Sequence, residues 1–156
     1  ARYRKGHFEG VIDVMQRLTK IIKPRKIYMG EKDFQQFYLV KKYFKKRFNT
    51  KIISCKTIRD DKLAFSSRNI LLNKIDLDKA NKVSIEIFFL KKKLERTRNI
   101  KKLLSDKKKE LINSYNVRFD YLELRNIFDF KNSKKIKNSK LFFAYYINKV
   151  RLIDNF

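Results

Sequence analysis

Apolar side chains near the start of the chain follow a helical pattern. Between residues 8 and 22 they recur at spacings of three and four, which places them on one face of a helix. The members of this face are Val11, Val14, Met15, Leu18 and Ile22. Pro24 is expected to end the helix, because proline cannot continue its hydrogen bonding. Residues 26–29 then predict a short buried strand that ends at Gly30.

The alternation of helix and strand continues to residue 55. A second helix is predicted to begin near Asp33, whose side chain is suited to capping it. The apolar run at residues 51–55 predicts another strand, in which Cys55 is expected to be a buried small residue rather than a nucleophile. This order favours a parallel sheet with crossover helices. The expected inner face of the second helix consists of Phe37, Val40 and Phe44.

The pattern changes after about residue 70. Two long helices with basic outer faces are followed by an alternating strand and two closely spaced strands that can form a hairpin. We therefore predict two domains, a parallel α/β domain at residues 1–70 and a small α+β domain with antiparallel strands at 71–156. The expected elements of the second domain are helices at 77–96 and 100–114, strands at 117–121, 140–147 and 149–154, and a loop at 131–139.

The chain is strongly basic. Its 41 Lys and Arg against 16 Asp and Glu give a formal charge of +25, which makes a basic nucleic-acid-binding protein without catalysis the alternative interpretation. However, the lysines are scattered through every segment, and Gly (3), Pro (1) and Trp (0) are scarce, as compositional drift would produce. Most aromatic residues also sit at core spacings rather than on a basic face.

Other features of composition narrow the class of protein. A hydrophobic fraction of 43% is sufficient for a folded core. The single cysteine excludes an internal disulfide. The sequence contains no apolar stretch of membrane-spanning length and no signal-peptide pattern. We expect a soluble cytoplasmic protein.

The first polar segment that could carry chemistry follows the strand ending at Gly30. Ligands of parallel α/β sheets bind at the carboxyl ends of strands, where a helix N-terminus can receive an anion. Lys32 could neutralise phosphate, Asp33 could hold Mg²⁺, and Gln36 could bind a polar substrate. An ordinary strand-to-helix turn, with glycine at the bend and Asp33 as cap, explains the same residues without a ligand.

The second polar segment is Phe65-Ser66-Ser67-Arg68-Asn69, which lies between apolar residues. Two hydroxyls beside a guanidinium form a compact set of donors for phosphate oxygens. A capped loop between domains is the alternative. His7 is the only histidine, and we expect it to have a structural role rather than a catalytic one.

These segments, in this order, resemble the pantoate–β-alanine ligases, also called pantothenate synthetases. The family patterns are G-H-F-x-G-V, G-E/Q-K-D-x-Q-Q, T-V-R-E-x-D-G-L-A-x-S-S-R-N and a closing R-L-I-D-N. The matching pieces here are residues 6–11, 30–36, 57–59, 63–69 and 151–155, and residues 120–124 resemble the family's C-terminal strand. The matches span nearly the whole chain.

The resemblance implies a Rossmann-like nucleotidyltransferase domain followed by a C-terminal lid domain. Such enzymes activate pantoate with ATP as pantoyl-adenylate, and β-alanine then displaces AMP to give pantothenate. ATP and Mg²⁺ are the implied cofactors, with a homodimer expected for the full-length enzyme. The implied ATP contacts are Gly30, Glu31, Lys32, Asp33, Ile58, Phe65, Ser66, Ser67 and Arg68. Of these, Lys32, Ser66, Ser67 and Arg68 are the expected catalytic residues, Asp33 is the expected magnesium ligand, and Gln36 is expected to bind pantoate.

Two departures from the family pattern affect these expectations. The family's M-G-x-L-H-x-G-H motif does not occur in the chain, whose one histidine, His7, matches a later segment. We therefore expect the chain to be the C-terminal part of such an enzyme, with the first half of the nucleotide-binding domain missing. In addition, Lys62 replaces a family glycine, which is expected to stiffen its loop and shift Arg68.

Overall fold

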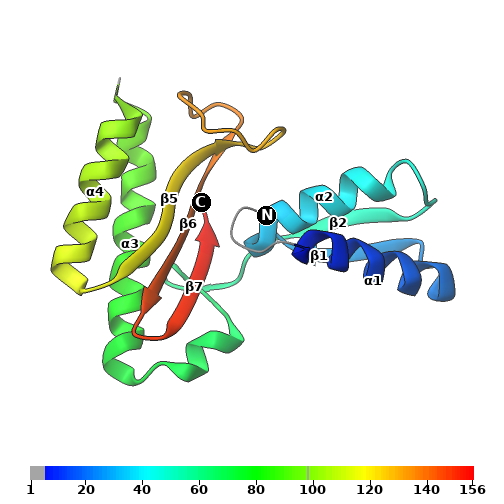
Figure 1. Ribbon diagram of the computed structural model, residues 1–156, viewed down its shortest axis with the longest axis horizontal. Coiled ribbons are helices and arrows are strands. Elements are labelled where there is room, and N and C mark those ends of the chain that lie inside the picture. Colours follow the sequence, from blue (N-terminus) through cyan, green and yellow to red (C-terminus); the bar gives the residue numbers. More distant parts are fainter. Residues whose placement is uncertain (1–5, 98) are drawn as a thin grey trace. The chain divides into compact units, whose positions relative to one another are not determined.

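The computed structural model describes residues 6–97 and 99–156. It divides into two compact units, Ala1–Thr57 and Ile58–Phe156, and each is described by itself. Figure 1 shows the elements of both units coloured along the chain.

The first unit contains two helices and a two-stranded parallel sheet. Helix α1 spans His7–Ile22, strand β1 Lys26–Gly30, the short 3₁₀ helix η1 Glu31–Asp33, helix α2 Phe34–Phe44 and strand β2 Lys51–Cys55. The strands pair in parallel, so that Gly30 is the neighbour of Cys55. The predicted helix, strand, helix, strand order is confirmed, and so is the inner face of α2. The core of the unit consists of Phe37, Val40, Phe44 and Ile52, with Val11, Ile12, Met15, Ile27 and Met29 packed against them.

Three details of this unit differ from the sequence expectations. Strand β1, predicted to be buried, alternates between exposed and half-buried residues. Cys55 is exposed rather than buried, because it lies at the carboxyl end of β2, beyond Ile52, the buried residue of that strand. Asp33 occupies the N-cap position of α2, but its side chain makes no capping hydrogen bond. The polypeptide reaches α2 through the 3₁₀ turn instead of a capped start.

The second unit begins with a small hairpin and a 3₁₀ helix. Strands β3, Arg59–Asp60, and β4, Leu63–Ala64, pair antiparallel, and η2, Ser67–Leu71, follows. The left-handed residue of the hairpin turn is Asp61, with φ 49°. Lys62 is not among the left-handed residues, so the replacement of glycine at this position introduces no backbone strain there.

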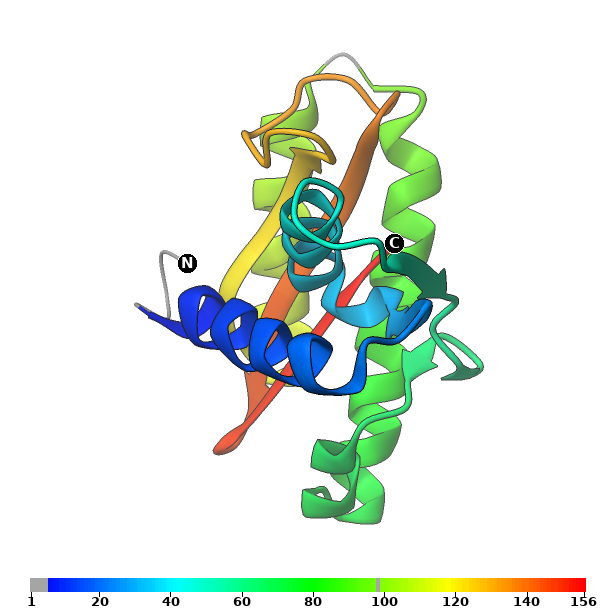
Figure 2. The same cartoon turned by 90° about the vertical axis from the view of Figure 1, so that its right-hand side faces the viewer.

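The remainder of the second unit is a three-stranded antiparallel sheet covered on one face by two helices (Figures 1 and 2). Helices α3 and α4 span Lys74–Leu94 and Ile100–Tyr115. Strands β5, β6 and β7 span Arg118–Asn126, Ser139–Ile147 and Val150–Asn155, and lie side by side in that order. The predicted β6–β7 hairpin is confirmed. Strand β5 continues past the alternating pattern predicted at residues 117–121, and its register with β6 shifts between Phe119 and Tyr121.

The boundary between the units lies earlier than the predicted domain boundary at residue 70. The segment from Ile58 to Leu71 belongs to the second unit. Leu63 is buried in the core that α3, α4 and the antiparallel sheet share, and Arg59 forms an ion pair with Asp154 of β7. These interactions join the Phe65–Arg68 segment to the C-terminal unit rather than to the parallel strands. Within the described parts of the chain, no helix has the length and apolar character needed to cross a membrane.

Candidate functional site

In the first unit, the predicted ATP-binding residues lie at the carboxyl end of β1. Gly30 is the last residue of the strand, and Glu31, Lys32 and Asp33 form the 3₁₀ turn that leads into α2. The location is the one at which parallel α/β sheets bind ligands, and the first N–H groups of an 11-residue helix lie directly after the turn. The expected placement on a strand end and helix start is thus what the structure shows.

The geometry of Gly30 does not itself require glycine. Its φ of −69° and ψ of 138° are ordinary extended values. A Cβ built on it would meet no atom within 4 Å. Neither a left-handed turn nor close packing within the chain explains the glycine, so this geometry does not support the alternative in which glycine serves the bend. Its missing side chain leaves the backbone at the end of β1 open to close approach by a ligand.

Asp33 and Gln36 extend this site into the first turn of α2. Asp33 is exposed and makes no capping hydrogen bond, so its carboxylate is not committed to the helix start. Gln36 is half-buried, one residue before the buried Phe37. The described residues include no group of three His, Cys, Asp or Glu that could hold a metal. One carboxylate together with phosphate oxygens and water nevertheless suits Mg²⁺, which takes few protein ligands at nucleotide sites.

In the second unit, Ile58 and Phe65 form an exposed apolar pair. The backbone N–H of Phe65 donates to the carbonyl of Ile58 at 3.1 Å, which continues the β3–β4 hairpin by one step. The two residues are 75% and 60% exposed. Two such side chains, brought together by one backbone hydrogen bond, provide a surface against which a flat aromatic ring could pack.

Ser66, Ser67 and Arg68 follow directly and present polar donors. The Ser66 hydroxyl accepts a hydrogen bond from the Arg68 backbone N–H at 3.3 Å and caps η2. The Arg68 guanidinium donates through Nη1 to the backbone carbonyl of Arg151 in β7 at 3.1 Å. The acceptor of this bond is neutral, so the contact leaves the charge of Arg68 uncompensated. The segment is capped, as the alternative interpretation of a capped loop requires, but it lies within the second unit and not between domains.

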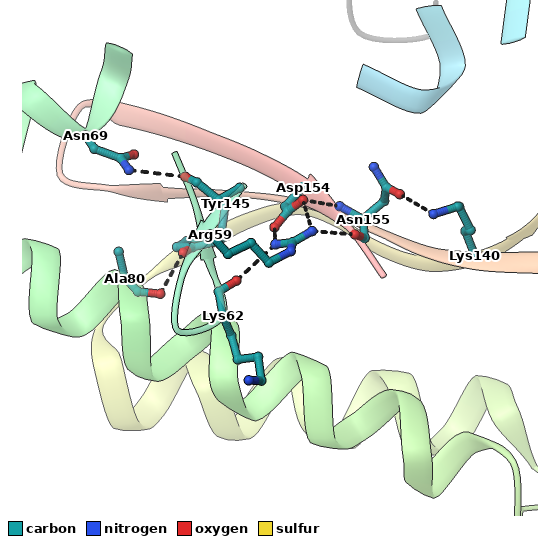
Figure 3. A network of polar contacts seen from close by, with 9 residues as sticks. Arg59, Lys62, Asn69, Ala80, Lys140, Tyr145, Asp154 and Asn155 are labelled. Carbon is teal, nitrogen blue, oxygen red and sulfur yellow. Dashed lines mark hydrogen bonds and ion pairs between the residues drawn. The ribbon is translucent and has the colours of Figure 1, made fainter. Parts of the chain in front are cut away.

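A buried ion pair behind this segment was not identified from the sequence as part of the site. Arg59 of β3 pairs with Asp154 of β7 through the two terminal guanidinium nitrogens, Nη1 and Nη2 (Figure 3). The Asp154 side chain is only 5% exposed. The sequence contains an indication of this ion pair in its last five residues. There Asp154 occupies a core-facing position between Leu152 and Phe156. A charged residue at such a position requires a partner.

The two groups of predicted residues belong to different units. Gly30, the 3₁₀ turn and Gln36 are brought together within the first unit, and Ile58 with Phe65–Arg68 within the second. His7 is the first residue of α1, half-buried, with its ring 5.5 Å from that of Phe8.

Comparison with known proteins finds the same family over the whole chain. The sequence model described as pantoate-beta-alanine ligase matches residues 1–156. The pantothenate synthetase of Francisella tularensis subsp. mediasiatica (strain FSC147) is 39% identical over 155 residues, which make up 98% of this chain and 51% of that protein. The chain thus spans about half the length of the curated relatives that it matches.

Solved structures show the same similarity in three dimensions. The pantothenate synthetase of Thermus thermophilus has a TM-score of 0.89 at 27% identity, covering 99% of this chain and 57% of the other. The pantoate-beta-alanine ligase of Francisella tularensis, complexed with beta-gamma ATP and beta-alanine, has a TM-score of 0.74 at 36% identity, covering 99% and 52%. The fold, with its parallel pair of strands and separate antiparallel sheet, is therefore that of part of a pantothenate synthetase.

Proposed function

Because this chain belongs to the pantoate–β-alanine ligase family, we propose that it supplies part of the ATP site of a ligase that condenses pantoate with β-alanine. The reaction proceeds through pantoyl-adenylate and yields pantothenate, AMP and pyrophosphate. The observation that carries the proposal is the order of groups in one segment of the second unit. Exposed Ile58 and Phe65 offer an apolar surface for a base, and Ser66, Ser67 and Arg68 directly beyond them offer donors for phosphates.

In the first step, an oxygen of the pantoate carboxylate attacks the α-phosphorus of ATP and pyrophosphate leaves. Negative charge on the phosphate chain is then redistributed toward the leaving group. Lys32, Ser67 and Arg68 have the cationic and hydroxyl groups that stabilise such charge. Ser66 supports them, because its hydroxyl holds the Arg68 backbone. The expected contribution of these side chains is positioning and neutralisation rather than covalent chemistry.

The turn after β1, considered within the first unit alone, is a second segment that we propose binds ATP. Its open glycine backbone and the N-terminus of α2 suit a phosphate group. Asp33 would hold Mg²⁺, which when bound would neutralise phosphate charge. Gln36, in the first turn of the same helix, would orient pantoate through its amide group.

In the second step, the amine of β-alanine attacks the acyl carbon of pantoyl-adenylate. The bond to the phosphate oxygen breaks, AMP leaves, and the amine loses a proton as the amide forms. We propose that the chain does not complete this sequence alone, because its 156 residues contain only one histidine and no H-x-G-H motif. The lid role of the C-terminal domain, homodimer formation and residence in the cytoplasm are further parts of the family-based proposal.

The test measures ATP binding and product formation separately. Isothermal titration with Mg²⁺–ATP should show binding to the purified chain, and GTP is the matched control ligand. Pantothenate and AMP, followed by mass spectrometry, should not accumulate with the chain alone. They should form when the chain is mixed with the part of the Francisella enzyme that it does not match. Steady synthesis by the chain alone contradicts its dependence on other residues, and failure of both ATP binding and complementation contradicts the proposed function.

Nucleic-acid binding is the competing proposal, and the +25 charge is the feature that favours it. Titration with duplex and single-stranded oligonucleotides at physiological salt distinguishes the two functions. The ligase proposal predicts weak, non-saturating association that disappears as salt rises. Tight and saturable binding would favour the nucleic-acid function.

A further inference from the structure

The Arg59 guanidinium is held on several sides within the second unit. Nη1 donates to Asp154 Oδ2 and, at 3.0 Å, to the carbonyl of Lys62. Nη2 donates to Asp154 Oδ1 at 3.0 Å and to the carbonyl of Asn155 at 3.1 Å. The guanidinium carbon also lies 4.6 Å from the centre of the Phe156 ring. Figure 3 shows the side chain reaching from the hairpin to the end of β7.

The location of Asp154 makes this contact more than a surface ion pair. Its strand neighbour is Phe143 of β6, which belongs to the core between sheet and helices. Side chains of a strand alternate between faces, so Asp154 stands on the core side, between Leu152 and Phe156. A carboxylate in that position is costly to bury without a partner. Arg59 supplies the partner, and the hairpin that carries Arg59 is thereby attached to β7.

Strand β7 also holds the other end of the same segment. The Arg151 carbonyl, three positions before Asp154, accepts the hydrogen bond from the Arg68 guanidinium at 3.1 Å. Directly after the second attachment, the Asn69 side chain donates to the carbonyl of Ala64 at 3.2 Å and closes the segment on itself. The residues from Ile58 to Arg68 are consequently fastened to one strand at both ends.

We propose that the Arg59–Asp154 pair is a positioning clamp, by which β7 sets the placement of the Ser66–Arg68 phosphate donors. Asp154 and Arg59 are positioning residues, because they act through the segment that they hold and not on the nucleotide. This inference rests on the proposed function for its consequence in ATP binding. Its structural part is that the Ile58–Arg68 segment needs Asp154 to keep its placement, and this can be tested without any ligand.

The matched control is an ion pair in the same unit that lies away from the segment. Lys107 of α4 donates to Glu86 of α3 at 2.5 Å and to Glu110 at 2.8 Å. A Lys107→Met variant removes a largely buried cation and lowers stability without touching the hairpin or β7. A clamp and a general stabilising contact therefore differ in which amides they protect.

The experiment compares the whole chain with the variants Asp154→Asn, Arg59→Lys and Lys107→Met. Hydrogen exchange is measured at the Phe65, Arg68 and Asn69 amides and, as internal reference, at the amides of the β5–β6 ladder. Mg²⁺–ATP affinity is measured on the same samples. Arg59→Lys keeps the charge but loses the two-pronged geometry, and provides a milder variant should Asp154→Asn fail to fold.

We expect Asp154→Asn and Arg59→Lys to raise exchange at the three segment amides about tenfold or more relative to the β5–β6 amides. Mg²⁺–ATP affinity should fall by about tenfold as donors lose their placement. Lys107→Met should do neither. In an Arg59→Met background, Asp154→Asn should add little to the loss of ATP affinity, because Asp154 acts through Arg59.

The clamp is contradicted if hydrogen exchange in Asp154→Asn and Arg59→Lys rises equally at all amides, so that the segment amides behave as they do in Lys107→Met. It is also contradicted if Asp154→Asn binds ATP as tightly as a wild-type chain that binds ATP. If the wild-type chain does not bind ATP, the proposed function fails, and the exchange data alone decide between a clamp and a general stabilising contact.

Discussion

Arg68 and Arg151 are joined by a hydrogen bond from the Arg68 guanidinium to the Arg151 backbone carbonyl, 3.1 Å long. The acceptor is a neutral peptide oxygen on strand β7, so the contact orients the guanidinium without neutralising its charge. An arginine held in this manner keeps its positive charge and further donors available for a phosphate. This relationship leads to the first prediction.

Replacing Arg68 by lysine should weaken Mg²⁺–ATP binding about tenfold, and replacing it by alanine about 100-fold. Lysine keeps the charge but lacks the planar fork. Because one hydrogen bond to Arg151 is lost, unfolding free energy should fall by only about 1 kcal/mol. ATP titration and urea denaturation of both variants check the two effects. Equal ATP affinity in wild type and Arg68→Ala would remove Arg68 from the site.

Cys55 should respond to occupation of the proposed site. It is exposed, and in the parallel register it is the strand neighbour of Gly30, the first residue of the proposed phosphate-binding turn. We expect the thiol to react with a maleimide without denaturant and Mg²⁺–ATP to slow the reaction several-fold. Mass spectrometry of the labelled chain measures the rate. A Cys55→Ser variant, which cannot be labelled there, is the control, and labelling unaffected by saturating ATP would contradict a site at this end of β1.

Restoring glycine at position 62 should destabilise the second unit. Lys62 pairs with Asp61 at 3.1 Å, and its Nζ lies 4.9 Å from the centre of the Phe88 ring. The left-handed residue of the turn is Asp61, so glycine at 62 relieves no strain. We expect Lys62→Gly to lower the unfolding free energy by about 1 kcal/mol. Urea denaturation tests this, with Asp61→Gly as the comparison, for which the left-handed φ predicts a smaller loss or a gain. A more stable Lys62→Gly would show that lysine strains the turn.

Lys107 should contribute a stability that disappears at high pH. Burial acts to lower its pKa, but hydrogen bonds and charges from Glu110 and Glu86 outweigh this and raise the pKa above its ordinary 10.5. A raised pKa means that the folded state holds the proton more tightly than the unfolded state. The stabilisation is therefore complete below the unfolded pKa and is lost as pH rises through the folded value.

Lys107→Met should accordingly be less stable than wild type by about 1 kcal/mol at pH 7. The difference should shrink above about pH 10.5. Urea denaturation of both proteins across this range supplies the measurement, and comparing the two cancels titrations that they share. A difference that stays constant to the highest pH at which both remain folded would contradict the role of the charge.

Tyr145 should make the chain sensitive to alkali. It is 1% exposed, its hydroxyl donates to the Ala80 carbonyl at 3.3 Å, and burial strongly raises the pKa of its phenol. In the unfolded chain the phenol ionises from about pH 10, whereas the folded state keeps it neutral. The free energy of unfolding therefore falls as pH rises above the pKa that the Tyr145 phenol has in the unfolded chain.

A Tyr145→Phe variant should be within about 1 kcal/mol of wild type at pH 7. Its unfolding free energy should fall less steeply between about pH 10 and 11. Tyr121, whose pKa burial also raises, remains in both proteins and supplies part of the slope. Identical slopes for wild type and Tyr145→Phe would contradict a buried neutral phenol at position 145.

The sequence by itself determined the order of elements and the segments that carry chemistry. Periodicity identifies α1, α2 and the two parallel strands, because apolar residues recur at helix or strand spacing in each of them. The periodicity does not report burial, since Val14, Leu18 and Ile22 of the predicted α1 face are exposed. The Gly30–Gln36 turn and the Ser66–Arg68 donors were recognisable because polar groups cluster there without serving a core. Both features depend only on residues that are close together in the sequence, so they can be recognised without the structure.

Only the tertiary structure decided how these segments are held. Arg59 and Asp154 are 95 positions apart, so their pairing, the division of the units at Thr57 and the attachment of Arg68 to β7 depend on chain topology. The register shift in β5 and the exposure of Cys55 likewise depend on which strands become neighbours. Long-range pairing follows from the packing of the whole unit, and no local pattern of residues specifies it.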